Sequence, residues 1–442
     1  MATKNQIIAA IDIGTTKVVA IAGVKDEFGK INILGYGQAE SKGVVRGSVQ
    51  NVSEVSAAIN TAVTKCKAKA GCEFRNVFVG IAGQNVRTEI NTHSKFIDSG
   101  IIKQADIDQL TREVYTISKD AGEEIIHVIP QEYIVDGSSI IGSAAGCPGR
   151  KLEGKFFVAV GKANSITAIR QAVNMAGLNI VKIILEPIAS SEAVLTEDEK
   201  EAGVLVADIG GGTTDIAVYQ KKVLKTTSYV PFGGNAVTND IKNACHIIER
   251  QAENLKVKYG SALNLSEYSK KIAVVNSFGT AKEISFSDLA NIINARLDEI
   301  LGGIACLIEK YALRDSLTAG IVITGGGAKL NNIIRLIKFR LGTDVRLGQV
   351  RNVDVNASGL NDSEYTASVG LLIKGFEYLE TYLAGQSRAA QETQKSDTNL
   401  EKEQQSKSAT SGTSKGKKKE GGFFSRIKKW ASDFLEDPED NA

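Results

Sequence analysis

The chain has 442 residues, with 53 Lys and Arg against 51 Asp and Glu, a net charge of +2 at pH 7, and five cysteines. This length allows two or three domains with large cores, and the near-neutral charge gives no global field that would favour nucleic acid. An odd number of irregularly spaced cysteines argues against a disulfide framework or a zinc site and indicates a reducing compartment. No run approaches the roughly 18 apolar residues of a spanning helix, so we expect a cytosolic protein unless a segment anchors it from the inside.

The first predicted element is a strand, turn and strand over residues 7–22. A buried strand delivers an aspartate, and a glycine and two threonines follow before the second strand begins. Glycine lets backbone N–H groups turn towards an anion, threonines add hydroxyl donors, and the carboxylate suits a cation beside the anion. The candidate phosphate-binding residues of this turn are Asp12, Gly14, Thr15, Thr16 and Lys17.

A compact α+β insertion is predicted over residues 84–155. It follows an amphipathic helix that ends at Gly71 and a buried strand that ends in glycines near Gly83. Within it we expect a strand over 86–96, a helix over 104–121 and a strand over 124–135, after which residues 156–160 return to the parent sheet. His93 and His127 lie in this segment, where a lone histidine is more often a structural residue than a ligand.

The next predicted strand, residues 180–185, delivers Glu186, and Pro187 begins a helix, where its missing N–H costs nothing. Residues 203–219 then repeat the pattern of the N-terminal hairpin around three consecutive glycines. The candidate residues here are Asp208, Gly210, Gly211, Gly212, Thr213 and Thr214. The alternative is a glycine-rich turn between two core strands, but an internal repeat indicates two similar domains that face one ligand. The glycines lead into a strand, which excludes the Walker and dinucleotide patterns.

A third glycine run, Gly325, Gly326 and Gly327 with Lys329, follows a strand and precedes a helical pattern over residues 331–339. Bare backbone at a helix N-terminus can accept a flat ring. Upstream, Glu253 and Lys256 lie three apart on a predicted helix over 251–260. A long helix is predicted over 285–310.

Residues 385–421 contain almost no large apolar side chain, so we expect a flexible linker. Beyond it, residues 422–436 form an amphipathic helical pattern with basic residues, which is typical of a helix lying in a membrane surface. The candidate membrane-binding residues are Phe423, Phe424, Arg426, Ile427, Lys428, Lys429, Trp430, Phe434 and Leu435. The alternatives are a helix that docks on a partner or on the body of the protein.

Five motifs in this order resemble those of the actin/Hsp70/sugar-kinase superfamily. They are residues 11–18 (first phosphate motif), 185–190 (first connecting helix), 206–219 (second phosphate motif), 324–329 (adenosine motif) and 365–370 (second connecting helix). The insertion and the C-terminal amphipathic segment further resemble FtsA, the actin-like family of the bacterial division ring. The resemblance implies an α/β fold of two similar domains around a nucleotide cleft, with an inserted α+β subdomain in the first domain and a flexible C-terminal tail.

The resemblance also implies roles for single residues. Asp12 and Asp208 would hold Mg²⁺ through water beside ATP, and Glu186 would orient the attacking water. The other interpretation of Glu186 is an acidic residue that satisfies the dipole of the first helical turn. Glu253 and Lys256 would hold the ribose and adenine, or would form only a surface ion pair. The family usually has another Gly or Pro near position 332, where this chain has Asn332, so the adenine end of the pocket departs from the family pattern.

The domain organisation implied in this way has nine segments. They are 5–83 and 156–200 (first domain), 84–155 (inserted subdomain), 201–231 and 306–365 (second domain), 232–305 (fourth subdomain), 366–384 (helix returning to the first domain), 385–421 (linker) and 422–436 (membrane helix).

The function implied is an ATP-binding division protein that polymerises on the inner face of the cytoplasmic membrane at the septum. It would attach FtsZ filaments there, bind the FtsZ tail on its fourth subdomain, and recruit later division proteins. Any ATPase activity would be slow and serve as an assembly switch, since no arginine finger is visible in the sequence. The alternatives are a phosphotransferase of the sugar-kinase branch, which would need an acceptor site with a catalytic aspartate, and a rod-shape actin, which lacks the insertion.

Overall fold

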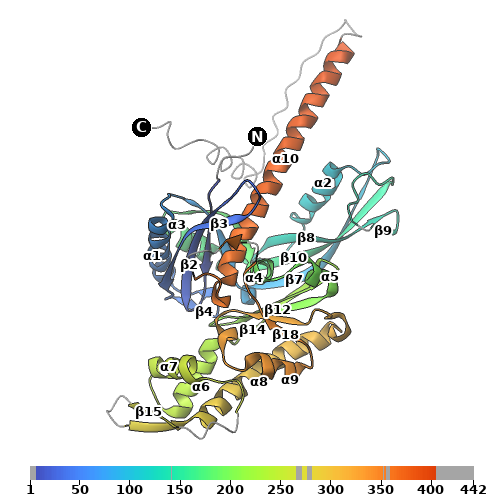
Figure 1. Cartoon of the computed structure of the whole chain (residues 1–442). Coiled ribbons are helices and arrows are strands. Elements are labelled where there is room, and N and C mark those ends of the chain that lie inside the picture. The colour runs from blue at the N-terminus through green and yellow to red at the C-terminus, as the bar shows by residue number, and fades with distance from the viewer. Residues whose placement is uncertain are drawn as a thin grey trace, which may run out of the picture. The chain divides into compact units, whose positions relative to one another are not determined.

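A computed structural model describes residues 6–140, 142–264, 271–275, 281–351, 353–354 and 359–404 (Figure 1). The chain divides into two compact units, Met1–Lys374 and Gly375–Ala442. The sheets and the site described below all belong to the first unit. The expected membrane helix, residues 422–436, lies outside the described residues, so its prediction stays a prediction.

The first sheet has the strand order β11-β6-β1-β2-β3-β19. The strands are β1 Ile8–Ile13, β2 Lys17–Lys25, β3 Ile31–Glu40, β6 Asn76–Ile81, β11 Asn179–Leu185 and β19 Val353–Asp354. Two short strands, β4 Val44–Val45 and β5 Ser48–Val49, form a separate ladder. Helix α1 (Val52–Ala70) packs on β2 and β3 and on α3 (Ala163–Met175). Helix α1 ends at Gly71 with φ 64°, as predicted, and it is capped at its start by Asn51, whose side chain accepts from two backbone N–H groups.

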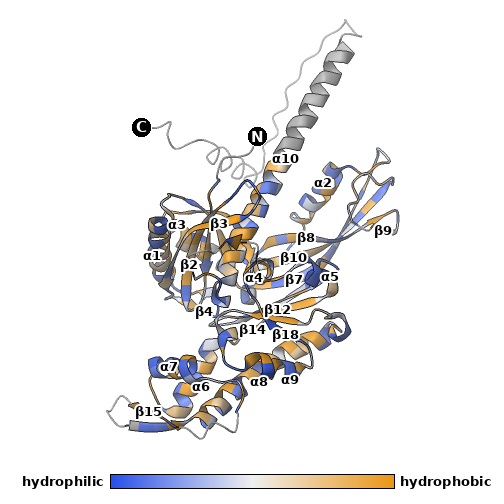
Figure 2. Cartoon of the chain, viewed as in Figure 1, coloured by the Kyte–Doolittle hydropathy of each residue, from blue (hydrophilic) through white to orange (hydrophobic). Residues whose placement is uncertain are grey.

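The second sheet repeats the first. Its order is β14-β13-β12-β17-β18. The strands are β12 Val204–Ile209, β13 Thr214–Gln220, β14 Val223–Val230, β17 Ile321–Thr324 and β18 Val345–Leu347. In each sheet a central buried strand, β1 or β12, pairs antiparallel with the next strand and parallel with a strand from further along the chain. The internal repeat predicted from the two hairpins is therefore a repeat of topology, and Figure 2 shows hydrophobic residues along β12.

A third sheet, of order β7-β10-β8-β9, is formed by the insertion. Its elements are β7 Val86–Phe96, α2 Gln104–Val114, β8 Glu123–Val135, β9 Ser138–Ile140 and β10 Lys151–Lys162. The expectation that residues 156–160 return to the parent sheet was wrong, because β10 pairs with β7 and β8 along its whole length. The first half of this strand was not predicted, because charged residues alternate there at Lys151, Glu153 and Lys155. Helix α2 also ends earlier than predicted, before a turn that reaches Gly122 at φ 85°.

The remaining helices lie mainly in the second half of the first unit. They are α4 Glu186–Val194, α5 Glu197–Ala202, α6 Gly234–Cys245, α7 Glu249–Tyr259, α8 Phe286–Lys310 and α9 Ile333–Leu341, with the hairpin β15 Lys271–Val275 and β16 Ala281–Ser285. Two large apolar cores stabilise the unit. One includes Ile11, Ile59 and Leu185, and the other includes Leu205, Ile293 and Ile323.

Helix α10 runs from Thr366 to Gln404. The expectation of a flexible linker that begins at Gly385 was therefore wrong for its first half. Residues 386–404 contain no glycine or proline and are rich in Ala, Gln, Glu and Lys, which favour helix even without an apolar face. Residues 405–421 lie outside the described part of the chain. Among the described residues, no helix is both long and apolar enough to cross a bilayer.

Candidate nucleotide site

The three glycine turns meet in one cavity of about 570 Å³ in the first unit. This volume is typical of a site for a small ligand. Nearly all of the predicted site residues line it: Asp12, Gly14, Thr15, Thr16, Lys17, Glu186, Asp208, Gly210, Gly211, Gly212, Thr213, Glu253, Lys256, Gly325, Gly326, Gly327 and Lys329. Thr214 is the exception. It is fully buried, and its hydroxyl donates to the carbonyl of Phe232, so it supports the adjoining loop and is not a phosphate donor.

The two hairpin turns lie directly against each other. A Cβ on Gly211 would lie 2.4 Å from Cγ2 of Thr16, and a Cβ on Gly212 would lie 2.5 Å from Oγ1 of Thr15. A third glycine, Gly233, is held against the same turn, because its own Cβ would lie 2.4 Å from the carbonyl oxygen of Gly210. Only glycine therefore allows these backbones to approach so closely. Backbone cradles of this kind suit phosphate oxygens.

Four carboxylates line this cavity: Asp12 and Asp215 are buried, and Asp208 and Glu186 are half-buried. Burial raises the pKa of Asp208 to about 7, against a hydrogen bond from the Ser190 hydroxyl. Burial likewise raises the pKa of Asp12, whose carboxylate accepts from Ser368 at 2.9 Å. Asp215 and Glu186 behave in the same way: burial raises the pKa of both groups, and for Glu186 the other three acids raise it further. So many acids in one buried place are costly unless they act on a ligand.

A hydrated divalent cation fits this donor set. Among the described residues, no group of three or more His, Cys, Asp and Glu side chains is arranged to hold a metal ion by itself. Asp12 and Asp208 lie at the ends of the equivalent strands β1 and β12. A cation held there through water would complete its shell with ligand oxygens, which is how Mg²⁺ is usually bound beside phosphates.

Glu186 begins α4, with Pro187 beside it. Its carboxylate packs on the backbone of β6, because a Cβ on Gly80 would lie 2.9 Å from Oε1 of Glu186. An acid that served only the helix dipole would act through its ionised form, whereas the surroundings of Glu186 raise its pKa and so disfavour that form. An acid with a raised pKa, in a cavity, is better suited to accept a proton or to orient water.

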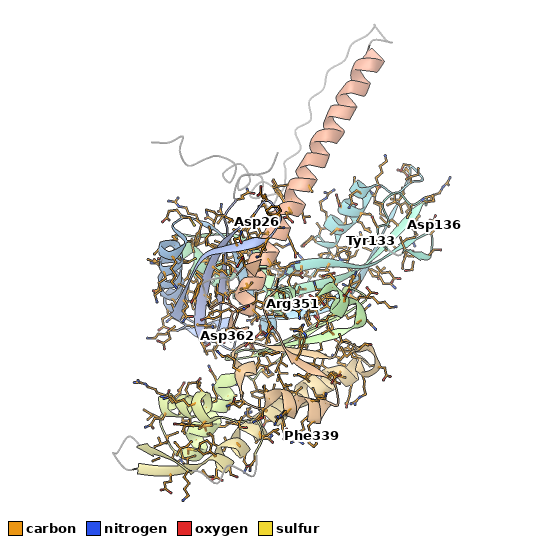
Figure 3. All side chains as sticks on the ribbon, in the orientation of Figure 1. Asp26, Tyr133, Asp136, Phe339, Arg351 and Asp362 are labelled. Carbon is orange, nitrogen blue, oxygen red and sulfur yellow. The ribbon has the colours of Figure 1, made fainter. Side chains whose placement is uncertain are left out.

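Lys17 and Lys329, two of the three lysines that were predicted to bind ligand, are paired with acids outside the glycine turns. The Lys17 ammonium lies 2.6 Å from Oε2 of Glu364 and 3.8 Å from the centre of the Tyr365 ring. Lys329 lies 2.5 Å from Oδ2 of Asp362, which Figure 3 labels, and 3.4 Å from Glu364. Glu364 therefore bridges the first and third glycine turns.

Glu253 and Lys256 form the ion pair of one interpretation and lie at the cavity that the other requires, so the ribose and adenine contact stays a prediction. They form an ion pair at 2.7 Å, and Lys256 also donates to the Thr238 hydroxyl at 2.8 Å and to the Gly234 carbonyl at 3.1 Å. They also line the cavity. Apolar walls continue from them, formed by Val257, Leu297, Ile300 and Leu330 with Asn331. An apolar slot with a few polar groups suits a nucleobase and its ribose.

Neither histidine of the insertion lies at this cavity. His127 is buried and its Nε2 accepts from the backbone N–H of Leu185 at 3.1 Å. His93 lies 3.2 Å from a carboxylate oxygen of Glu113. Both contacts agree with the structural interpretation.

The chain was compared with known proteins and family models. A model described as cell division protein FtsA matches residues 205–370, and one described as the SHS2 domain inserted in FtsA matches residues 80–160. Cell division protein FtsA of Pseudomonas aeruginosa is 33% identical over 376 residues, covering 84% of this chain and 90% of the relative. That of Escherichia coli K12 is 31% identical over 385 residues, covering 85% and 92%.

The chain belongs to the FtsA family. The FtsA insertion corresponds to the sheet β7-β10-β8-β9, which includes β10 up to Lys162. Solved structures show that the fold is actin-like. A chain of the PilM–PilN type IV pilus biogenesis complex superposes with a TM-score of 0.61 at 15% identity, covering 83% of this chain and 98% of that one. MreB5 of Spiroplasma citri bound to ADP gives 0.51 at 14% identity, covering 86% and 97%.

Sequence reasoning missed several residues of the FtsA cavity. Asp215 closes the same glycine motif as Asp208 and could have been found by its place in that motif. Glu364 precedes the second connecting helix without any pattern that predicts its partners. Ser190 and Ser368 lie near the starts of α4 and α10, and each donates to one strand-end aspartate, Asp208 and Asp12 respectively.

Proposed function

We propose that this FtsA-family protein binds ATP with Mg²⁺ in the cavity, polymerises on the inner face of the cytoplasmic membrane at the division septum, and attaches FtsZ filaments there. The nucleotide part is supported by the convergence of three glycine turns and four carboxylates on one cavity. MreB5, which has the same fold, was solved with ADP bound.

In this proposal the glycine turns around Thr15 and Gly211 hold the phosphates, and Asp12 and Asp208 hold the hydrated cation. When bound, Mg²⁺ supplies positive charge that neutralises the phosphate oxygens. Glu186 orients water and receives its proton, which its raised pKa favours. Because no arginine finger is visible in the sequence, we expect slow turnover, which suits a switch.

The membrane part of the proposal relies on residues 422–436. Burying two or three aromatic side chains contributes about 1.5 to 3 kcal/mol each, against roughly 1 kcal/mol for each basic residue near anionic lipid. The apolar face therefore dominates binding. The FtsZ tail binds the fourth subdomain, residues 232–305, and the filament recruits later division proteins.

A pelleting assay on anionic vesicles with ATP, Mg²⁺ and FtsZ tests the proposal. Trp430→Glu should abolish sedimentation with vesicles, whereas Lys428→Ala should weaken it modestly and lower its salt dependence. Both variants should keep the nucleotide affinity of the parent, and Asp208→Ala should lose it without losing vesicle binding. Vesicle binding by the Trp430 variant at parental level would contradict the membrane anchor, and rapid phosphate transfer to a sugar would favour the kinase alternative.

A further inference from the structure

The inserted sheet meets the strand that delivers Glu186, and His127 makes a hydrogen bond between the two. Strand β8 of the inserted sheet lies against β11 of the first sheet. β11 is the outermost strand of its sheet, and among the described residues β6 is its only strand partner. An outer strand has backbone N–H groups without a ladder partner, and these need acceptors when buried.

His127 provides such an acceptor at the last residue of β11. Its Nε2 accepts the backbone N–H of Leu185 at 3.1 Å, and its side chain is 8% exposed. The pairing of β8 with β10 shifts register next to this residue, from Ala159 opposite His127 to Val160 opposite Ile125. Such a β-bulge re-aims a side chain and is common beside functional sites.

Only a neutral imidazole can accept this hydrogen bond, because both nitrogens of the protonated ring are donors. Burial holds the pKa of His127 well below its ordinary value, and the positive charges of Lys182 on β11 and Lys374 on α10 lower it further. Across the ladder on β10, its neighbour is the uncharged Ala159. The ring therefore stays an acceptor near neutral pH.

The residue after Leu185 is Glu186. Its carboxylate lies against the backbone of Gly80, and the other three acids of the cavity raise its pKa further. A shift of about 1 Å at a reacting group can cost up to about a hundredfold in rate. The hydrogen bond at Leu185 fixes the backbone from which Glu186 projects.

We propose that His127 is a positioning residue for Glu186, so that the inserted sheet sets the geometry of the catalytic carboxylate. The proposal rests on the proposed role of Glu186 in ATP hydrolysis. It gives the inserted sheet a role in ATP hydrolysis. Displacement of β8 would change the rate of hydrolysis although the inserted sheet does not contact the nucleotide.

Phosphate release by the full chain with ATP and Mg²⁺ on anionic vesicles provides the test. His127→Leu removes the acceptor and should lower kcat roughly ten- to hundredfold with KM unchanged. His127→Gln, whose amide oxygen can accept, should restore most of kcat. His93→Leu is the matched control, because His93 lies in the same sheet but pairs with Glu113, and its kcat should equal that of the parent.

A double-mutant cycle separates positioning from a merely structural role. In a Glu186→Gln background, His127→Leu should lower the residual rate no further, because the group that it positions is already gone. Equal losses in both backgrounds, or a parental kcat for His127→Leu, would overturn the proposal. If Glu186→Gln hydrolyses ATP like the parent, the proposed function of Glu186 fails instead.

Hydrogen exchange gives a readout that needs no activity. The peptide containing the Leu185 amide should exchange faster in His127→Leu and return towards the parental rate in His127→Gln. If the leucine variant does not fold, His127→Asn replaces it, because its oxygen sits on a shorter side chain. Parental exchange at Leu185 in a folded leucine or asparagine variant would show that the hydrogen bond does not fix this strand end.

Discussion

A single methyl group at Gly211 should separate the two phosphate turns. An ideal Cβ there would lie 2.4 Å from Cγ2 of Thr16, whereas carbon atoms in contact lie about 3.5–4.0 Å apart. More than about 1 Å of separation must therefore be gained. Overpacking of this kind costs about 1 to 3 kcal/mol.

This cost should appear in nucleotide affinity. Without ligand, the two turns around Thr16 and Gly211 can move apart and relieve the clash. A bound phosphate chain must be held by both turns at once, so the clash then opposes binding. Because each 1.4 kcal/mol is a tenfold change, Gly211→Ala should weaken ATP binding about 5- to 150-fold. Titration with a fluorescent ATP analogue and Mg²⁺ measures it.

A compensating substitution makes the reasoning testable. Thr16→Ser removes the clashing Cγ2 but keeps the hydroxyl, so the double variant Gly211→Ala, Thr16→Ser should recover most of the lost affinity. Thr16→Ser alone is the control. Parental affinity for Gly211→Ala, or no recovery in the double variant, would refute the claim that the two turns close on one ligand.

Three further predictions concern single groups. The native pKa of Asp208, about 7, lies above its unfolded value of 3.8, so this group's contribution to stability is complete below about pH 4 and is lost as the pH rises through 7. In EDTA without nucleotide, raising the pH from 6 to 8 should lower the free energy of unfolding, measured by denaturant titration, by about 1.4 kcal/mol. The variant Asp208→Asn should not show this loss. Identical pH profiles of the parent and the variant would contradict the argument that burial raises the pKa of Asp208. If Glu253 and Lys256 contact the ribose, Glu253→Ala should reduce the preference for ATP over 2′-deoxy-ATP in competition titrations. An unchanged preference would show that the two residues form only an ion pair and do not contact the ribose. In the native protein, iodoacetamide should label the exposed Cys306 and spare Cys66, because Cys66 is buried and burial raises the pKa of its thiol to about 12. Mass spectrometry of peptides measures the labelling. Rapid labelling of Cys66 would mean that α1 opens readily.

Local chemistry determined much of this protein. Both strands that end on aspartate and glycine form an antiparallel hairpin with the strand that follows, because turn preferences act within a few residues. The two copies around Asp12 and Asp208 therefore predicted the repeat, and Asn51 and Gly71 are caps whose effect on α1 is local. The amphipathic pattern around Trp430 is likewise a property of the sequence. The vesicle assay tests whether a membrane is what this pattern binds.

The tertiary structure, by contrast, decided which residues that lie far apart in the sequence contact each other. Lys17 lies against Glu364, 347 positions along the chain, and no periodicity encodes such a pairing. Thr213 and Thr214 are neighbours in sequence, yet the Thr213 hydroxyl donates to Asp215, whereas that of Thr214, the first residue of β13, donates to the Phe232 carbonyl, and only Thr213 lines the cavity. β10 joined the inserted sheet because hydrogen bonding to β7 and β8 satisfies its backbone along its whole length. His127 became an acceptor for Leu185 only because two separate sheets meet there, since burial and charge at a residue depend on what the fold packs around it.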